Sequence, residues 1–221
     1  MNKLSTILCF LLPLTLASGG PQEETQSEKS SSQDKKIAKA ARTNDPIFID
    51  GNLTENVWYQ ADAKFDFTQY QPQNGEKPNE NTMFLVFYDE NNLYIGVYAM
   101  EKEPSTVMGK LRRRDDIMAL SDNIFIYIDT ENKGKNAYAF GVNPSGVKYD
   151  LYISNDDNYD FSWDGVWDAK VMREYGDQSD EKVQRRVGWT AEFRIPFSTM
   201  QYDNDNTEEW GINVTRFKGS T

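Results

Sequence analysis

The stretch from 121 to 153 constrains the fold most, because its apolar residues recur with the period of β-strands. Every second residue from Ile124 to Ile128 is isoleucine, and the residues between them point to the opposite side of an extended chain. Alternating runs follow at 138–142 and 147–153, separated by the Asn-Pro-Ser-Gly turn at 143–146. Three strands joined by short turns predict an antiparallel meander whose isoleucine face lies in the core.

The remainder of the chain adds short alternating runs bounded by Gly, Pro, Asn or Asp. We expect further strands at 46–49, 82–88, 93–99, 167–172, 189–195 and 210–217. Thr54 has the character of an N-cap and predicts one short helix that runs to Ala61. The pattern is typical of an all-β fold. We predict an antiparallel β-sandwich, jelly-roll-like, with this one short helix near the N-terminus.

The first 44 residues differ in composition from the rest. Residues 1–18 combine Lys3, an apolar run and a small-residue cleavage site near Ala17, which is the pattern of a signal peptide. The apolar run is shorter than a membrane-spanning helix of about 20 residues. Residues 19–44 are rich in Ser, Gln, Glu and Lys and predict a disordered linker. We expect an exported protein (periplasm, cell envelope or extracellular) with a folded domain at 45–221 and no transmembrane helix in the mature chain.

Composition excludes several classes of function. The chain has no histidine, which excludes Ser-His-Asp and Cys-His catalysis and zinc sites with histidine ligands. Its one cysteine, Cys9, lies in the predicted signal peptide, so the mature chain has no disulfide or thiolate site. The formal net charge of -11 argues against nucleic acid as a partner. Aromatic residues make up 13% of the chain, which suits β-sheets and sugar-binding surfaces.

Five short motifs occur in an order that resembles a known family. They are Ile49-Asp50-Gly51 with Glu55, Trp58 and Ala61, then the segments 88–95, 121–129, 188–197 and 210–214. Together they resemble family 9 carbohydrate-binding modules, and most of all the variant at the N-terminus of large bacterial cell-envelope proteins. The resemblance covers about 46–217. It implies a β-sandwich that binds sugar chains, is often attached to glycoside hydrolases and often holds structural calcium.

The resemblance does not include the tryptophan pair that sandwiches the sugar in well-understood members. One of that pair sits just before the strand that starts near Asp122, where this chain has Met118, Ala119 and Leu120. The other lies in a strand beyond the one at 210–217. We therefore expect the chain to be a fragment or the N-terminal domain of a longer protein, with C-terminal domains not present here and an open edge at its last strand.

An aromatic and acidic loop from 155 to 167 is a candidate for a different sugar-binding surface. Aromatic rings stack on the C–H faces of sugars, while carboxylates and guanidinium groups hydrogen-bond their hydroxyls. The candidate sugar-binding residues are Tyr159, Phe161, Trp163, Trp167, Arg113 and Arg114. Two alternatives stay open. The tryptophans pack the loop onto the sandwich, or the arginines form surface salt bridges with Asp115 and Asp116.

The same loop offers oxygen ligands for a calcium ion. The candidate ligands are Asn155, Asp156, Asp157 and Asp160, and Ca²⁺ is the one cofactor that the sequence suggests. Their spacing is not that of an EF-hand, and the alternative is a solvated acidic loop.

These features favour a secreted, non-catalytic carbohydrate-binding domain of a polysaccharide-degrading or envelope protein, with a polysaccharide or oligosaccharide as its partner. A second possibility is a structural or docking domain of a larger outer-membrane protein that has lost the sugar clamp. A third is part of a glycoside hydrolase acting on O-glycosyl bonds. Hydrolysis needs two carboxylates at a set separation, and no spacing singles out a pair among the 35 acidic residues.

Overall fold

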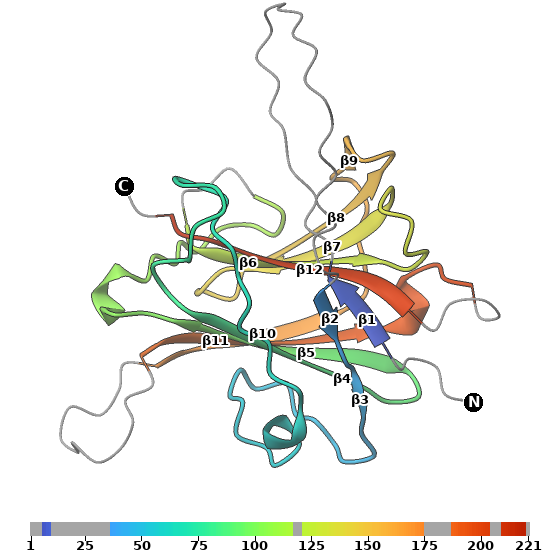
Figure 1. The fold of residues 1–221 in the computed structure, drawn as a ribbon, viewed down its shortest axis with the longest axis horizontal. Coiled ribbons are helices and arrows are strands. Elements are labelled where there is room, and N and C mark those ends of the chain that lie inside the picture. The colour runs from blue at the N-terminus through green and yellow to red at the C-terminus, as the bar shows by residue number, and fades with distance from the viewer. Residues whose placement is uncertain (1–5, 10–35, 117–120, 175–186, 204–208, 220–221) are drawn as a thin grey trace, which may run out of the picture.

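The computed structural model describes residues 6–9, 36–116, 121–174, 187–203 and 209–219. Two β-sheets lie one above the other as the layers of a sandwich (Figure 1), which confirms the predicted fold class. The seven-stranded sheet has the order β2 (Lys36–Ala38), β1 (Thr6–Cys9), β12 (Glu209–Phe217), β6 (Asn123–Asp129), β7 (Ala137–Val142), β8 (Lys148–Ser154) and β9 (Asn158–Asp160). The five-stranded sheet has the order β10 (Asp168–Glu174), β11 (Gly188–Pro196), β5 (Asn92–Met100), β4 (Thr82–Tyr88) and β3 (Ala41–Arg42).

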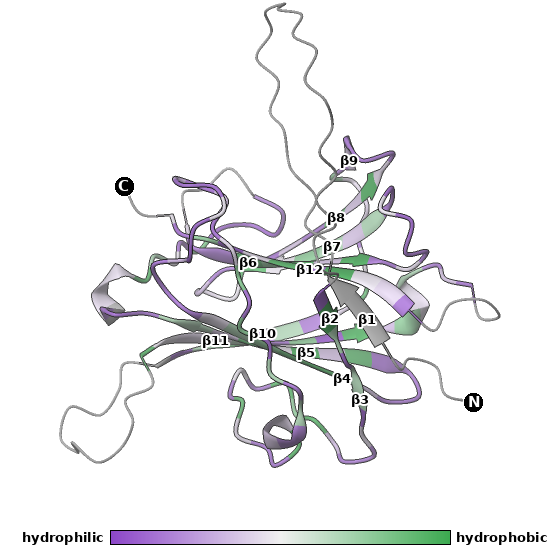
Figure 2. Ribbon diagram, viewed as in Figure 1, coloured by the Kyte–Doolittle hydropathy of each residue, from purple (hydrophilic) through white to green (hydrophobic). Residues whose placement is uncertain are grey.

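The predicted meander is β6, β7 and β8, and its isoleucine face lies in the core. Ile124, Ile126 and Ile128 are at most 1% exposed and belong to one cluster with Leu93 and Ile95 of β5. Figure 2 shows hydrophobic residues concentrated in the strands and hydrophilic ones in the connecting segments. Burial of apolar surface between the two layers is therefore the main stabilising contribution to the fold.

Strand β8 turns its polar residues towards the core side of the sheet. Ile126 pairs with Phe140, and Phe140 pairs with Asp150, so these three residues share the inner face. The apolar residues of β8, among them Leu151, lie on the outer face, where they are buried in a second cluster with Phe125. A charged side chain is thus placed on the inner face of β8, beside the loop that leads to β10.

Two strands form within the segment predicted as a disordered linker. Ala38 lies at the end of β2 and Ala40 follows it, and both small side chains pack into the main core. β3 extends the edge of β4 with a short parallel pairing. The ordered chain therefore begins before Asp45. β1 lies within the predicted signal peptide and pairs in parallel with β12, so it covers part of the edge predicted to be open. The signal peptide itself stays a prediction.

The helix predicted at 54–61 is reduced to a single 3₁₀ turn, η1 (Trp58–Gln60). The N–H of Trp58 donates to the carbonyl of Glu55 at 3.0 Å, a bond across three residues rather than four. The ring of Trp58 lies over Gly96 in the outer face of the five-stranded sheet, where a Cβ would meet it at 2.9 Å. Packing of this ring, rather than helical periodicity, fixes the segment, which crosses below the five-stranded sheet in Figure 1.

The remaining predicted strands correspond to observed ones, with ends that shift by a residue or two, except at 46–49. That segment is not a strand, although its Ile47 is buried. Two further 3₁₀ turns are η2 (Pro104–Thr106) and η3 (Phe197–Thr199). In the described part of the chain, no helix has the length and apolar character needed to cross a membrane.

Candidate functional site

The loop between β8 and β10 begins with two stacked aromatic rings. It turns back as β9, which places Tyr159 opposite Ile153 at the edge of the seven-stranded sheet. The rings of Tyr159 and Phe161 have centroids 6.3 Å apart and planes inclined by 19°. Tyr159 is half-buried, while Phe161 is 52% exposed. The pair is an accessible aromatic surface on an element that β8 holds in place.

The two tryptophans of the loop point into the sandwich instead. Trp163 contacts Tyr138 and Phe140, with centroid distances of 5.2 and 5.7 Å. Trp167 is 6% exposed, meets Phe140 edge-on at 5.3 Å and stacks on Phe193 of the opposite sheet at 6.0 Å. These are the contacts of core packing, the alternative that the sequence left open for both residues.

Arg114 fixes the last part of the loop. Its guanidinium donates two hydrogen bonds to Oδ1 of Asp150, at 2.9 and 2.6 Å, and one to the carbonyl of Gly165 at 3.1 Å. The second oxygen of Asp150 accepts the N–H of Gly165 at 2.5 Å, and Asp164 pairs with Arg114 at 2.7 Å. The Asp150 side chain is fully buried. Arg114 is therefore a positioning residue that neutralises a buried carboxylate, rather than a free group for a sugar.

Arg113 is placed differently, although it is adjacent in sequence. Its side chain is exposed and has no hydrogen bond or ion pair within the described structure. The next residues run along the edge of β8: the N–H of Asp115 donates to the carbonyl of Lys148, and Asp115 accepts the N–H of Asp150. Burial raises the pKa of the Asp115 carboxyl. Arg113 and the Tyr159–Phe161 pair thus stand on two segments that border the same strand.

The candidate calcium ligands lie in the turn between β8 and β9 and at the end of β9. Asn155 and Asp156 take positive φ values of 52° and 70° and form the turn between β8 and β9. Asp160 instead accepts the N–H and the hydroxyl of Ser162, at 2.9 and 2.6 Å. Among the described residues, no group of three or more acidic, histidine or cysteine side chains is arranged to hold a metal ion. This arrangement gives no support to calcium at this loop, and the calcium site stays a prediction.

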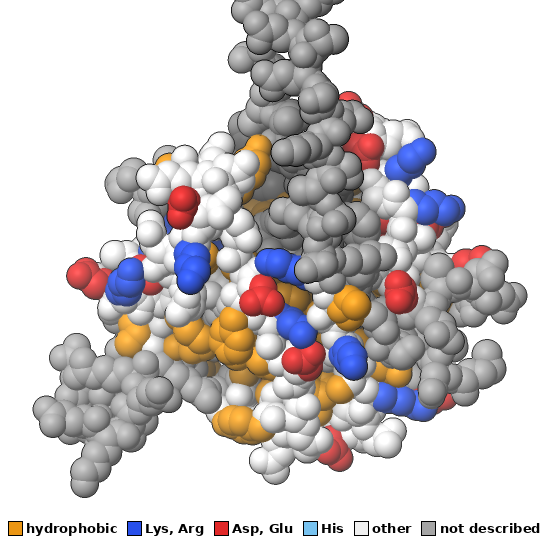
Figure 3. Space-filling model, viewed as in Figure 1, with side chains coloured by type: hydrophobic (Ala, Val, Ile, Leu, Met, Phe, Trp, Pro, Cys, Tyr) orange, Lys and Arg blue, Asp and Glu red, His pale blue; other side chains and the backbone are white. Residues whose placement is uncertain are grey.

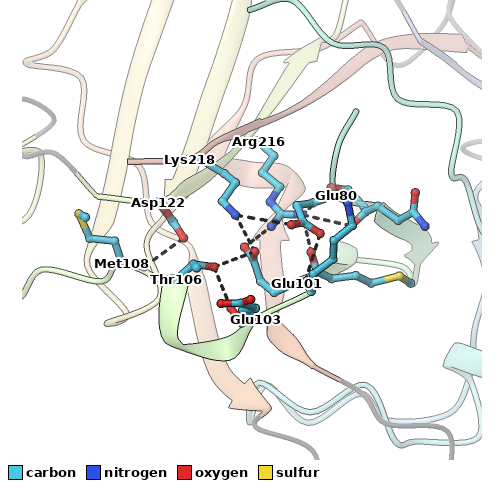
Figure 4. Close-up of polar contacts among 12 residues, drawn as sticks. Glu80, Glu101, Glu103, Thr106, Met108, Asp122, Arg216 and Lys218 are labelled. Carbon is cyan, nitrogen blue, oxygen red and sulfur yellow. Dashed lines mark hydrogen bonds and ion pairs between the residues drawn. The ribbon is translucent and has the colours of Figure 1, made fainter. Parts of the chain in front are cut away.

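A polar cluster that the sequence did not single out joins the two sheets (Figure 4). Arg216 of β12 reaches across to the other sheet, where it donates to the carbonyl of Met100 at 3.0 Å and pairs with the carboxylate of Glu101. The second oxygen of Glu101 accepts from Nζ of Lys218 at 2.7 Å. Next to it, buried Asp122 accepts the N–H groups of Met108 and Gly219, at 3.1 and 2.7 Å.

In the sequence, Asp122 of this cluster closely follows the position where the family resemblance puts the first sugar-binding tryptophan. Met118, Ala119 and Leu120, which take that place in the sequence, lie outside the described residues. One signal in the sequence did point to the cluster. Arg216 follows Trp210, Ile212 and Val214 at the same strand period, so it occupies a core-facing position.

A further buried carboxylate holds the N-terminal segment against the five-stranded sheet. Glu192 of β11 accepts the N–H groups of Asp50 and Gly51, at 2.9 and 2.7 Å, and the indole N–H of Trp58 at 3.0 Å. Burial raises the pKa of Glu192 to about 7, although these backbone donors act in the opposite direction. One carboxylate therefore binds both the Asp50-Gly51 turn and Trp58, which belong to the same motif in the sequence.

The family model described as "Carbohydrate family 9 binding domain-like" matches residues 49–220. This chain belongs to that family. A comparison with curated proteins gave no match.

Three solved structures are similar in fold at low sequence identity. A family 9 carbohydrate-binding module from Caldicellulosiruptor kristjanssonii in complex with glucose has 16% identity and a TM-score of 0.47, covering 74% of this chain and 71% of that chain. A structure of such a module from the same organism with cellotriose has 16% identity and a TM-score of 0.46, covering 76% and 70%. A candidate carbohydrate-binding protein from Bacteroides uniformis has 11% identity and a TM-score of 0.51, covering 80% and 81%.

Proposed function

We propose that this domain binds a polysaccharide or oligosaccharide without catalysing a reaction, and that the sugar lies against the Tyr159–Phe161 pair. The observation that carries the proposal is the stacked geometry of these rings, with Phe161 half exposed at a sheet edge. Membership of the carbohydrate family 9 binding domain-like family supports the ligand class. A ring that is already ordered loses little conformational freedom when a sugar stacks on it.

Polar groups at the same edge supply hydrogen bonds for the sugar hydroxyls. Arg113 and Asp157 are exposed and lie on the segments that flank the pair. Asp164 is 71% exposed at its side chain, but Arg114 already holds one of its oxygens. A ligand that spans these groups would be longer than one sugar ring, which favours a chain over a monosaccharide.

The proposal includes export. A signal peptide at 1–18 would carry the domain to the periplasm, the cell envelope or the outside of the cell, where polysaccharides occur. In a polysaccharide-degrading or envelope protein, such a domain would keep the rest of the protein close to its substrate, because linked binding raises the effective concentration.

Isothermal titration calorimetry with oligosaccharides of xylan, cellulose, pectin and β-glucan tests the proposal. We expect heat with at least one of them, and an affinity about tenfold weaker in Phe161→Ala. Phe217→Ala is the matched control, since Phe217 is 51% exposed and is the last residue of β12, outside the Tyr159–Phe161 pair. No heat from any of the four would overturn sugar binding and would favour the structural or docking function. Equal losses from both variants would refute the assignment of the site to the Tyr159–Phe161 pair.

A further inference from the structure

A polar cavity lies beside the turn between β4 and β5, in the sheet opposite to the one that carries the Tyr159–Phe161 pair. Its volume is about 310 Å³, and its walls are the segments 42–46 and 89–94. This volume is at the lower end of the range for ligand pockets, so it suits one sugar ring rather than a chain.

Hydrogen bonds hold both walls in place. Asp89 accepts the N–H groups of Asn91 and Asn92, each at 2.7 Å, and the hydroxyl of Tyr94 at 2.8 Å. On the other wall, the N–H of Thr43 donates to Tyr88 of β4 at 2.9 Å. The cavity is therefore formed by ordered backbone on both sides, and a ligand would not need to order it.

Five side chains that line the cavity are exposed and unpaired. None of these side chains makes a hydrogen bond or an ion pair in the described structure. They belong to Arg42, Asn44, Asp45, Glu90 and Asn91. Together they offer the donors of a guanidinium and two amides and the acceptors of two carboxylates. A hydroxyl both donates and accepts, so vicinal hydroxyls complement such a mixed set.

The net charge of the cavity lining indicates which class of ligand these side chains could bind. One cation, Arg42, faces three acidic residues, Asp45, Asp89 and Glu90, so the lining carries an excess of negative charge. This excess disfavours anionic sugars such as uronates. A metal ion is not supported either, because no group of three acidic side chains in the described residues is arranged to hold one. A neutral, polyhydroxylated ligand remains.

We propose that this cavity is a second sugar-binding site, which takes one neutral pyranose ring through hydrogen bonds from Arg42, Asn44 and Asn91 and to Asp45 and Glu90. The ring of Tyr94 is 6% exposed and offers no stacking surface. The site is therefore weak, with a Kd of about 1–10 mM. The choice of ligand rests on the proposed carbohydrate-binding function, but the site is separate from the Tyr159–Phe161 pair.

Amide chemical-shift titration of the full chain, with glucose and with cellotriose, tests the two sites separately. We expect saturable shifts at Asn44 and Asn91 with both sugars. The double variant Arg42→Ala/Asn91→Ala should weaken this binding at least about tenfold and leave the shifts around Phe161 unchanged. Lys77→Ala/Asn56→Ala is the matched control, because it removes an exposed cation and an exposed amide elsewhere on the surface. The thermal midpoint of each variant verifies that the fold is intact.

Each other outcome counts against a stated part of the proposal. Shifts around Phe161 without shifts at Asn44 and Asn91 would overturn this second site and leave the proposed function standing. Shifts at Asn44 that survive in the double variant would refute the role given to Arg42 and Asn91. A parallel titration with galacturonate tests the choice of a neutral sugar. Tighter binding of galacturonate than of glucose would refute that choice. An absence of shifts at both places would overturn both this site and the proposed function.

Discussion

Arg216 of β12 and Glu101 at the end of β5 form a buried ion pair between the two sheets. Their side chains are 7% and 0% exposed, so neither charge is solvated by bulk water. The Arg216 guanidinium also donates to carbonyls of Asn81 and Met100, and Lys218 occupies the second carboxylate oxygen of Glu101. Removal of either partner would leave the other charge buried with weaker compensation, which costs several kcal/mol.

We predict that Arg216→Ala lowers the free energy of unfolding by about 3–5 kcal/mol. The loss has two physical sources: the Glu101 carboxylate keeps only Lys218 and the Thr106 hydroxyl, and the carbonyls of Asn81 and Met100 lose a donor. Urea denaturation followed by tryptophan fluorescence measures it. Arg194→Ala is the control, because Arg194 and Asp168 form an ion pair whose side chains are 44% and 43% exposed. That variant should lose less than about 1 kcal/mol, and a similar loss in both variants would contradict the role of burial.

The Glu192 carboxylate should make stability depend on pH. Burial raises its pKa from 4.5 to about 7 in the folded protein. Between these values the folded state holds a proton that the unfolded state lacks. The contribution of Glu192 is therefore complete below about pH 4.5 and is lost as the pH rises through about 7. Asp50 and Glu55 lie close enough to add to the upward shift.

We expect the free energy of unfolding of Glu192→Gln to lack this dependence. Glutamine does not titrate in this range and keeps one of the two acceptor oxygens, so it loses the acceptor either for the N–H of Gly51 or for the indole N–H of Trp58. The difference in the free energy of unfolding between the natural protein and the variant should change by about 3 kcal/mol across the window. Parallel pH profiles of the two proteins, measured by urea denaturation, would show that Glu192 does not titrate there.

Strand periodicity was sufficient to predict the two-layer fold from the sequence. The alternation at 124–128 and 93–99 set which residues face the core, and the structure confirms both faces. Turn residues set the ends of β7 and β8 in the same way. These are local patterns, so a single sequence contains them. The helix at 54–61 was not predictable in the same way, because the packing of Trp58 against another part of the chain decides it.

The contacts of the candidate site were not predictable because they join distant parts of the chain. Arg114 and Asp150 are 36 residues apart, and nothing local to either residue indicates the pair. The inward direction of Asp150 follows from the register of β8 with β7, which the sequence of β8 alone does not fix. For the same reason, the sequence did not separate Phe161, which is exposed, from Trp167, which is buried.

Calcium should have little effect on the stability of this domain. The carboxylates of Asp156, Asp157 and Asp160 are not arranged as a ligand set in the described structure. We expect the thermal midpoint to be the same, within error, in excess calcium and in excess chelator, as measured by calorimetry. A ligand at a hundred times its Kd would add about 2.7 kcal/mol to the free energy of unfolding. A midpoint that rises with calcium, and no longer rises in Asp156→Asn/Asp157→Asn, would restore the loop as a calcium site.

The two kinds of aromatic residue in the 155–167 loop should respond oppositely to substitution. Trp167→Ala removes a ring that stacks on Phe193 and meets Phe140, and it should lower the free energy of unfolding by about 3–5 kcal/mol. Phe161→Ala removes a ring that is half in solvent, and it should lower the free energy of unfolding by less than about 1 kcal/mol while it weakens sugar binding. Urea denaturation and calorimetric titration of both variants separate the two effects. If Trp167→Ala kept full stability and lost sugar binding, Trp167 would be the contact residue and its packing role would be refuted.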